Sequence, residues 1–131
     1  MLRFENHTKY SSRALRSLVR ACEKHLGLRE SREVIFRYSK KSKHWGHATY
    51  PMKRYRGEEG HWAEFFLPGQ PEKLNFADLA WLIEHELLHN LGIRHGDMTQ
   101  AQRYGSGVPP KWALPYAERG VPFRVPTKKV V

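Results

Sequence analysis

Two histidines and a glutamate stand at a spacing that can bind a metal ion and use it. His85 and His89 are four residues apart, so on a helix their imidazoles lie on one face, one turn apart. Glu86 follows the first histidine and is offset around the helix axis, where a carboxylate can reach a water molecule on the metal without binding the metal itself. This pattern predicts a hydrolytic zinc site with Glu86 as the general base.

A third ligand is needed, because a catalytic zinc ion has three protein ligands and one open position. His95 is the candidate. Gly92 falls where the helix should end, and glycine adopts the left-handed conformation that lets the chain turn back towards the helix. We therefore predict a Zn²⁺ site formed by His85, His89 and His95.

Residues 85–95 read HELLHNLGIRH and fit the pattern H-E-x-x-H-x-x-G-x-x-H, which resembles the metzincin peptidases. The opening HELLHN, with a third histidine ten residues after the first, is also similar to the WLM and SprT-like proteases. The resemblance covers about eleven residues and implies a zinc metalloendopeptidase that acts on a protein or peptide substrate. Metzincins place a methionine in a turn beneath the metal. Met98 is the candidate here, although it follows His95 by three residues, unusually closely.

Other side chains leave two readings open. Cys22 is either a buried core residue or an inhibitory metal ligand, and Asp97 either orients a ligand or belongs to a turn. Tyr104 and Tyr116 are candidate oxyanion donors. Three further histidines either form a second metal site or are ordinary surface residues: His44, His47 and His61. Four aromatic residues either stack on nucleic-acid bases or belong to the core or a substrate cleft wall: Trp45, Tyr50, Tyr55 and Trp62.

The net charge of +10 is unevenly distributed. Residues 1–60 carry a net +9, residues 61–98 carry −4 and residues 99–131 carry +5. A basic excess serves either solubility or binding to a polyanion, so the rival interpretation is a nucleic-acid-binding module with a structural zinc. Non-specific binding to DNA or RNA is predicted through Lys40, Lys41, Lys43, Lys53, Arg54 and Arg56.

The periodicity of apolar residues predicts an α+β fold. A helix over 12–26 begins at Ser11 or Ser12 and ends at Gly27, and a second helix, apolar on nearly every side, begins at Asn75 or Asp78. Strands are expected at 33–38, 44–52 and 61–67, the last with a free edge for a substrate backbone. We predict a small twisted, mainly antiparallel sheet packed against both helices, followed by an irregular, proline-rich C-terminal part with a helical turn near 112–119.

The length of 131 residues suits one domain, over residues 1–131, with about 126–131 as a frayed tail. No segment is apolar for long enough to act as a signal peptide or cross a membrane. A lone cysteine excludes an intramolecular disulfide. Together these features favour the cytoplasm.

Overall fold

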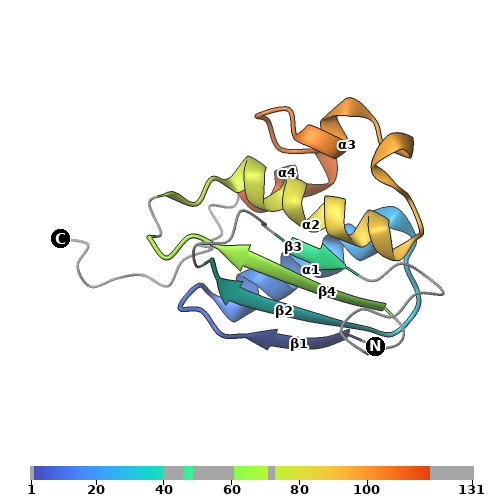
Figure 1. Ribbon diagram of the computed structural model, residues 1–131. Helices are drawn as coiled ribbons and strands as arrows, with labels where there is room; N and C mark the ends of the chain where they lie inside the picture. Colours follow the sequence, from blue (N-terminus) through green and yellow to red (C-terminus); the bar gives the residue numbers. More distant parts are fainter. Residues whose placement is uncertain (1, 40–45, 49–60, 71–72, 119–131) are drawn as a thin grey trace.

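A computed structural model describes residues 2–39, 46–48, 61–70 and 73–118 of the chain. They form an α+β fold, as the sequence predicts, with helices packed on a single sheet (Figure 1). The elements follow the chain in the order β1 (Leu2–Asn6), α1 (Ser12–Leu26), β2 (Arg32–Tyr38), β3 (Gly46–Ala48), β4 (His61–Leu67), α2 (Phe76–Asn90), the 3-10 turn η2 (His95–Asp97), α3 (Gln100–Tyr104), the 3-10 turn η3 (Lys111–Ala113) and α4 (Leu114–Glu118).

The sheet has the strand order β1-β2-β4-β3. β1, β2 and β4 are parallel, and only β3 runs antiparallel, to β4. The prediction of a mainly antiparallel sheet is therefore wrong. Helix α1 connects β1 to β2, and a helical crossover of this kind returns the chain to the same end of the sheet, which makes the two strands parallel. β4 lies between β2 and β3, so the prediction that strand 61–67 has a free edge is also wrong.

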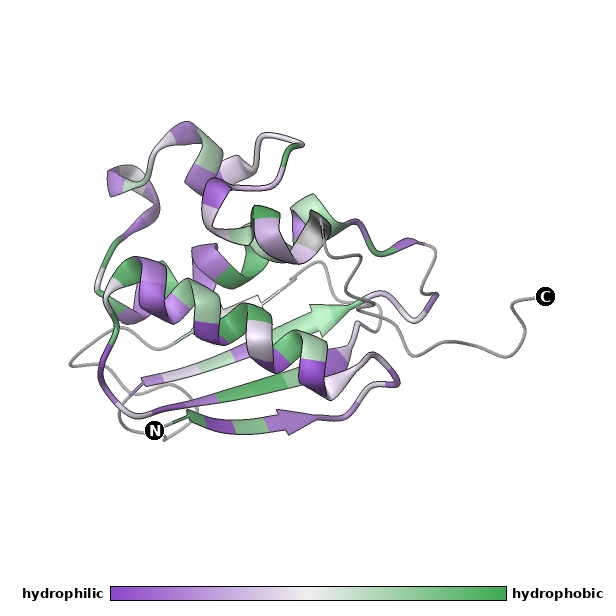
Figure 2. Cartoon of the chain, turned by 180° about the vertical axis from the view of Figure 1, so that it is seen from behind, coloured by the Kyte–Doolittle hydropathy of each residue, from purple (hydrophilic) through white to green (hydrophobic). Residues whose placement is uncertain are grey.

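Helix α1 has the bounds that the sequence predicts. The Ser11 side chain accepts a hydrogen bond from the Ala14 backbone N–H, and Gly27 ends the helix with a φ of 71°. Its apolar stripe faces the sheet, and its charged side chains lie on the opposite side. The helix nearest the viewer in Figure 2 is α1, and hydrophilic segments recur along its outer side.

Helix α2 is the central element. The Asn75 side chain caps its first turn by accepting hydrogen bonds from the backbone N–H groups of Ala77 and Asp78. Leu79, Ile83 and Leu87 are almost fully buried. α2 packs against α1 on one flank and against β3 and β4 beneath it. Because this helix is covered on nearly all sides, its polar residues lose contact with water.

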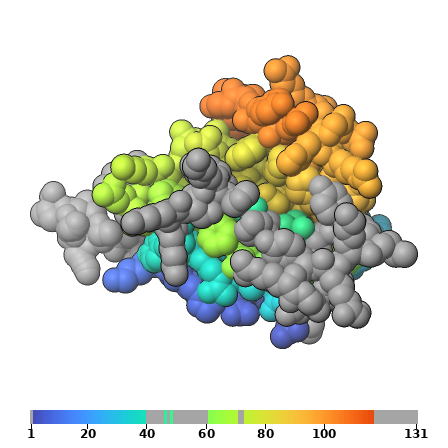
Figure 3. Space-filling model, viewed as in Figure 1, coloured from blue at the N-terminus to red at the C-terminus, as the bar shows by residue number. Residues whose placement is uncertain are grey.

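One hydrophobic cluster joins both helices to the sheet. Leu15, Leu18 and Val19 of α1 meet Phe36 of β2 and Phe65 of β4 there, and the last two rings stack with centroids 4.9 Å apart. α3 packs against α2, and the orange region that contains it lies above α2 in Figure 3. Among the described residues no helix is long and apolar enough to cross a membrane.

The remaining element predictions have mixed outcomes. The strands at 33–38 and 61–67 correspond to β2 and β4, and the helical turn near 112–119 corresponds to η3 and α4. Of the strand predicted at 44–52, only β3 is described. β1 is an additional strand; its alternation of partly buried Leu2 and Phe4 with exposed Arg3 and Glu5 is the pattern that indicates a strand. The proposed tail at 126–131 lies outside the described residues.

Candidate metal centre

The turn after α2 places one of the predicted ligands. Gly92 has a φ of 86°, as predicted for the residue that ends the helix. Its backbone N–H donates to the carbonyl oxygen of His89, and the N–H of Ile93 donates to that of Leu88. This pair of bonds is a Schellman motif. The motif turns the carbonyl of Ile93 back towards the helix, where it accepts a hydrogen bond of 2.8 Å from Nδ1 of His89.

Helix α3 fixes the other histidine of α2. The carbonyl oxygen of Gln102 accepts a bond of 2.9 Å from Nδ1 of His85 and one of 2.8 Å from the indole Nε1 of Trp81. α3 is itself held by a capping box between Thr99 and Gln102. Gly105, with a φ of 84°, lets the chain pass close over the Trp81 ring. Each histidine of α2 is thus oriented by a backbone carbonyl.

The three predicted ligands meet at one point. Nε2 of His95 lies 3.1 Å from Nε2 of His85 and 3.2 Å from Nε2 of His89. One ring nitrogen from each of the three residues lies within 4.8 Å of the other two. Two nitrogens bound to one tetrahedral zinc ion at about 2.05 Å would lie about 3.3 Å apart, close to the observed separations.

The hydrogen bonds of the rings also fit a metal. A carbonyl oxygen only accepts, so Nδ1 of both His85 and His89 must carry the proton, and a neutral ring then has its lone pair on Nε2. His95 has at most one Nε2 proton to share between these two lone pairs. A cation at the centre satisfies all three nitrogens, so this donor set can hold a metal ion.

Burial reinforces this chemistry. The pKa of His85 is lowered, chiefly by desolvation, and the neighbouring His95 and Arg103 lower it further. Desolvation also lowers the pKa of His89. Both effects favour the neutral imidazole, which is the form that binds a metal.

Glu86 is buried beside this cluster, with only 6% of its surface exposed. It packs against the backbone of β3: a Cβ atom at Gly46 would lie 3.0 Å from Cγ and 3.1 Å from Oε2 of Glu86. Among the described residues, no hydrogen bond reaches its carboxylate. Burial raises the pKa of Glu86 to about 8. A buried carboxylate without a hydrogen-bond donor is costly, and such groups are found preferentially at functional sites.

A buried polar network anchors the end of α2. The Asn90 side chain accepts a hydrogen bond of 2.7 Å from Nη1 of Arg32 and donates one of 3.2 Å to the carbonyl of Trp62. Nε of Arg32 donates to Glu23 of α1 at 2.8 Å. This network ties the last turn of α2 to β2, β4 and α1, so it fixes the position from which His89 and the following turn start.

Among the described residues, Cys22 and Asp97 do not belong to the ligand cluster. Cys22 lies on the buried face of α1, and burial raises its pKa, so it fits the core-residue reading. Asp97 is exposed in η2. The Nδ1 protons of His85 and His89 are donated to backbone carbonyls and not to the Asp97 carboxylate. Met98 ends η2, with its backbone N–H donating to His95. Tyr104 is 65% exposed, whereas Tyr116 is partly buried against the core.

Several predictions fall on residues that the structure does not describe. These are the basic segment (Lys40, Lys41, Lys43, Lys53, Arg54 and Arg56), the aromatic residues Trp45, Tyr50 and Tyr55, His44 and the side chain of His47. Trp62 is only 5% exposed, which favours packing over stacking on a base. His61 begins β4 and is partly buried.

Sequence reasoning missed the groups that orient the ligands. The carbonyls of Ile93 and Gln102 have no side-chain signature, although Thr99 and Gln102 have the spacing of a capping box and so indicate the short helix α3. Gly46 and Arg32 come from strands far from the motif in sequence. Only their positions in the folded sheet bring them to α2.

Comparisons with known proteins yield no match: no protein-family model fits the sequence, and no curated protein or solved structure is similar enough to count as a relative. The chemistry of the centre therefore has to be inferred from its own residues.

Proposed function

We propose that this chain is a zinc-dependent metallopeptidase that hydrolyses peptide bonds, with His85, His89 and His95 as ligands and Glu86 as the general base. The observation that carries the proposal is the convergence of three Nε2 atoms whose protonation is fixed by backbone carbonyls on two of the rings. The resemblance of residues 85–95 to zinc peptidases, metzincins and SprT-like proteases among them, agrees with it.

A zinc ion in this position supplies Lewis acidity, which makes a water molecule acidic near neutral pH and polarises the carbonyl under attack. The chain's own residues do the rest. Glu86 accepts the proton of the attacking water and delivers it to the leaving amine. The carbonyls of Ile93 and Gln102 keep the histidine rings in the orientation that binds the metal.

A metal held only for structure is supported less well. Structural zinc sites are closed by a fourth protein ligand, commonly a cysteine. The described residues offer three ligands to this cluster, and the lone Cys22 is buried in the core. A structural site also gives no role to the buried carboxylate of Glu86.

An extended substrate has a strand beside the site with which it can pair. β3 is at the edge of the described sheet, and its Gly46 touches Glu86. Backbone pairing with an edge strand holds a peptide in extended form without demanding a particular side chain, so we expect the substrate to align along β3.

The test combines metal content with turnover. We expect about one zinc ion per chain, hydrolysis of a denatured protein, and loss of hydrolysis on chelation that added zinc restores. Glu86→Gln should keep the zinc content and lower the rate by about 100-fold to 10,000-fold, since an amide preserves the shape but does not accept the proton. Full zinc occupancy without turnover in the parent would indicate a structural metal, and an active Glu86→Gln protein would rule out Glu86 as the base.

A further inference from the structure

The solvent-facing side of α1 carries a row of cations that the proposed peptidase chemistry does not use. Arg13, Arg16, Arg20 and Lys24 are all exposed, and the remaining exposed residues of the helix are Ser12 and His25. At about 100° per residue the four cations fall within about 80° of the helix circumference, along about 16 Å of its axis. We refer to these four residues as the α1 basic row.

In the described ranges, no acidic side chain pairs with this row. The one acidic residue of α1 is Glu23, which is engaged by the buried Arg32. Within the described part of the chain, none of the four cations forms an ion pair. Like charges three or four residues apart on a helix repel each other by about 0.2 to 0.5 kcal/mol per pair, so the row destabilises the isolated helix. An anionic partner would remove that repulsion.

We propose that the α1 basic row binds the phosphate backbone of nucleic acid without sequence preference. This goes beyond the proposed peptidase function and does not depend on it. Nucleic acid offers a negative charge about every 3.4 Å along each strand, so a straight row of cations finds phosphates in any register. Three of the four residues are arginines, whose planar guanidinium groups bind phosphate through two hydrogen bonds.

Other polyanions fit the row less well. A membrane-bound helix inserts its apolar face into the lipid, but Leu15, Leu18 and Val19 are packed in the core. An acidic protein would need carboxylates spaced to match the row. The net charge of +10 further favours a partner with a dense, continuous negative charge.

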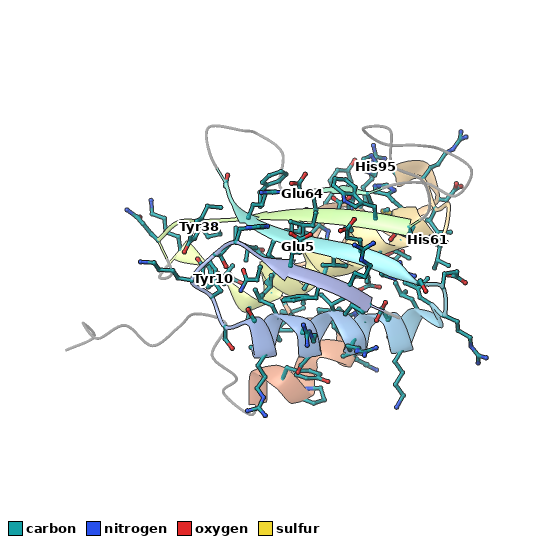
Figure 4. The ribbon with its side chains drawn as sticks, turned by 90° about the horizontal axis from the view of Figure 1, so that it is seen from below. Glu5, Tyr10, Tyr38, His61, Glu64 and His95 are labelled. Atoms are coloured by element: carbon teal, nitrogen blue, oxygen red, sulfur yellow. The ribbon has the colours of Figure 1, made fainter. Side chains whose placement is uncertain are left out.

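The row lies on the solvent-facing side of α1, whereas α1 packs against α2 through another side, where His25 lies 3.9 Å from Glu84. α1 runs beside β1, where Arg16 lies over the Phe4 ring with its guanidinium carbon 5.0 Å from the centroid, whereas β3 is at the opposite edge of the sheet. In Figure 4, α1 runs along the lower part of the view and the His95 label lies near the top, beyond the strands. Nucleic acid bound to α1 would therefore leave the metal centre open.

The experiment measures binding of a fluorescent duplex of about 20 base pairs by anisotropy between 50 and 200 mM salt. All proteins carry Glu86→Gln, so the result does not depend on proteolysis. The row variant is Arg13→Gln, Arg20→Gln and Lys24→Gln; Arg16 is kept because it packs on Phe4. The matched control replaces Lys73, Arg94 and Lys111, all exposed, with Gln, so both variants lose three charges.

We expect the control to bind like the parent. In the row variant the slope of log affinity against log salt should become shallower by about 2.7, because each lost contact removes about 0.9. The parent should then lose about 40-fold more affinity than the row variant over this fourfold salt range. Single variants such as Arg20→Gln, which should each remove about 0.9 from the slope, keep the test valid if the triple variant unfolds.

Three results would overturn the inference. One is no detectable binding by the parent at 50 mM salt. Another is a row variant that binds no more weakly than the control. The third is binding of phosphatidylserine vesicles or polyglutamate as tight as binding of the duplex, which would make the partner a polyanion other than nucleic acid.

Discussion

The two long helices have the same length and similar ends but opposite surroundings. α1 and α2 each span 15 residues, each begins at a side-chain cap, and each is followed by a glycine with positive φ, Gly27 and Gly92. Five residues of α1 are buried, against twelve of α2. Most polar side chains of α1 therefore stay in water, whereas most of those of α2 have been removed from it.

This difference singles out the candidate functional residues. Buried polar groups are destabilising unless they find partners, and most of those on α2 do. Glu84 accepts a bond from the Trp112 indole, His85 and His89 donate to carbonyls, and Asn90 binds Arg32. Glu86 is the member of this run whose carboxylate receives no hydrogen bond within the described chain, which agrees with its proposed role as the base.

The comparison predicts its largest effect at a buried pair. Asn90→Ala removes the acceptor of a buried guanidinium and the donor to the Trp62 carbonyl, so we expect a loss of about 3 to 4 kcal/mol in the free energy of unfolding. Arg20→Ala on α1 should change it by less than about 0.5 kcal/mol. Urea denaturation measures both, and equal effects of the two substitutions would contradict the contrast between the helices.

The next effect concerns the charge of Glu86 in zinc-free protein. Its pKa is about 8 in the folded chain and ordinarily 4.5, so the folded state keeps a proton that the unfolded chain releases as the pH rises above 4.5. Stability is therefore lost between pH 4.5 and 8. Glu86→Gln avoids this loss and should stabilise the chelated protein by about 3 kcal/mol at pH 7, but not at pH 4. Denaturation of both proteins at the two pH values measures this. A stabilisation by Glu86→Gln that was larger at pH 4 than at pH 7 would contradict the raised pKa of Glu86.

The third effect concerns His95, the exposed member of the proposed ligand set. His95→Ala leaves two protein ligands, and a 100-fold loss of zinc affinity removes up to about 2.7 kcal/mol of the stabilisation that zinc provides. The variant should hence melt near the temperature of the chelated parent in the presence of zinc. His25→Ala, which removes a half-exposed histidine of α1, serves as the control. Unchanged zinc affinity in His95→Ala would remove His95 from the centre.

Local signals made much of this structure predictable. Ser11, Asn75 and Gly92 have side-chain or backbone chemistry that begins or ends a helix, and the structure uses all three in that way. The spacing of His85, His89 and His95 in the same way predicts a cluster that the structure brings together.

The errors concern long-range pairing. Alternation along residues 33–38 and 61–67 indicates strands but not their direction, which depends on the crossover through α1 and on β1 at the edge. Nothing in the short segment 46–48 shows which strand it joins, so the sequence does not reveal that β3 covers the edge of β4. Likewise, every residue has a backbone carbonyl, so only the fold reveals that those of Ile93 and Gln102 orient the histidines.

The smallest predicted effect tests whether β3 positions the proposed base. Gly46 has no left-handed φ, so alanine there is not strained by its own backbone. Its Cβ would instead lie 2.9 Å from the carbonyl oxygen of Glu64 and 3.1 Å from Oε2 of Glu86. β3 must therefore shift against the β4 backbone as well as against the carboxylate, and because this displaces Glu86 we expect kcat to fall about 10-fold with zinc content unchanged.

Gly96 provides the matched control for this substitution. It lies next to a proposed ligand, His95, but a Cβ there meets nothing within 4 Å. Gly96→Ala should therefore keep the parent's kcat, KM and zinc content. If both alanine variants retained full activity, contact with β3 would not position Glu86. If Gly46→Ala instead lost zinc, the substitution would also disturb the proposed ligands on α2. The idea that β3 positions Glu86 without affecting metal binding would then be wrong.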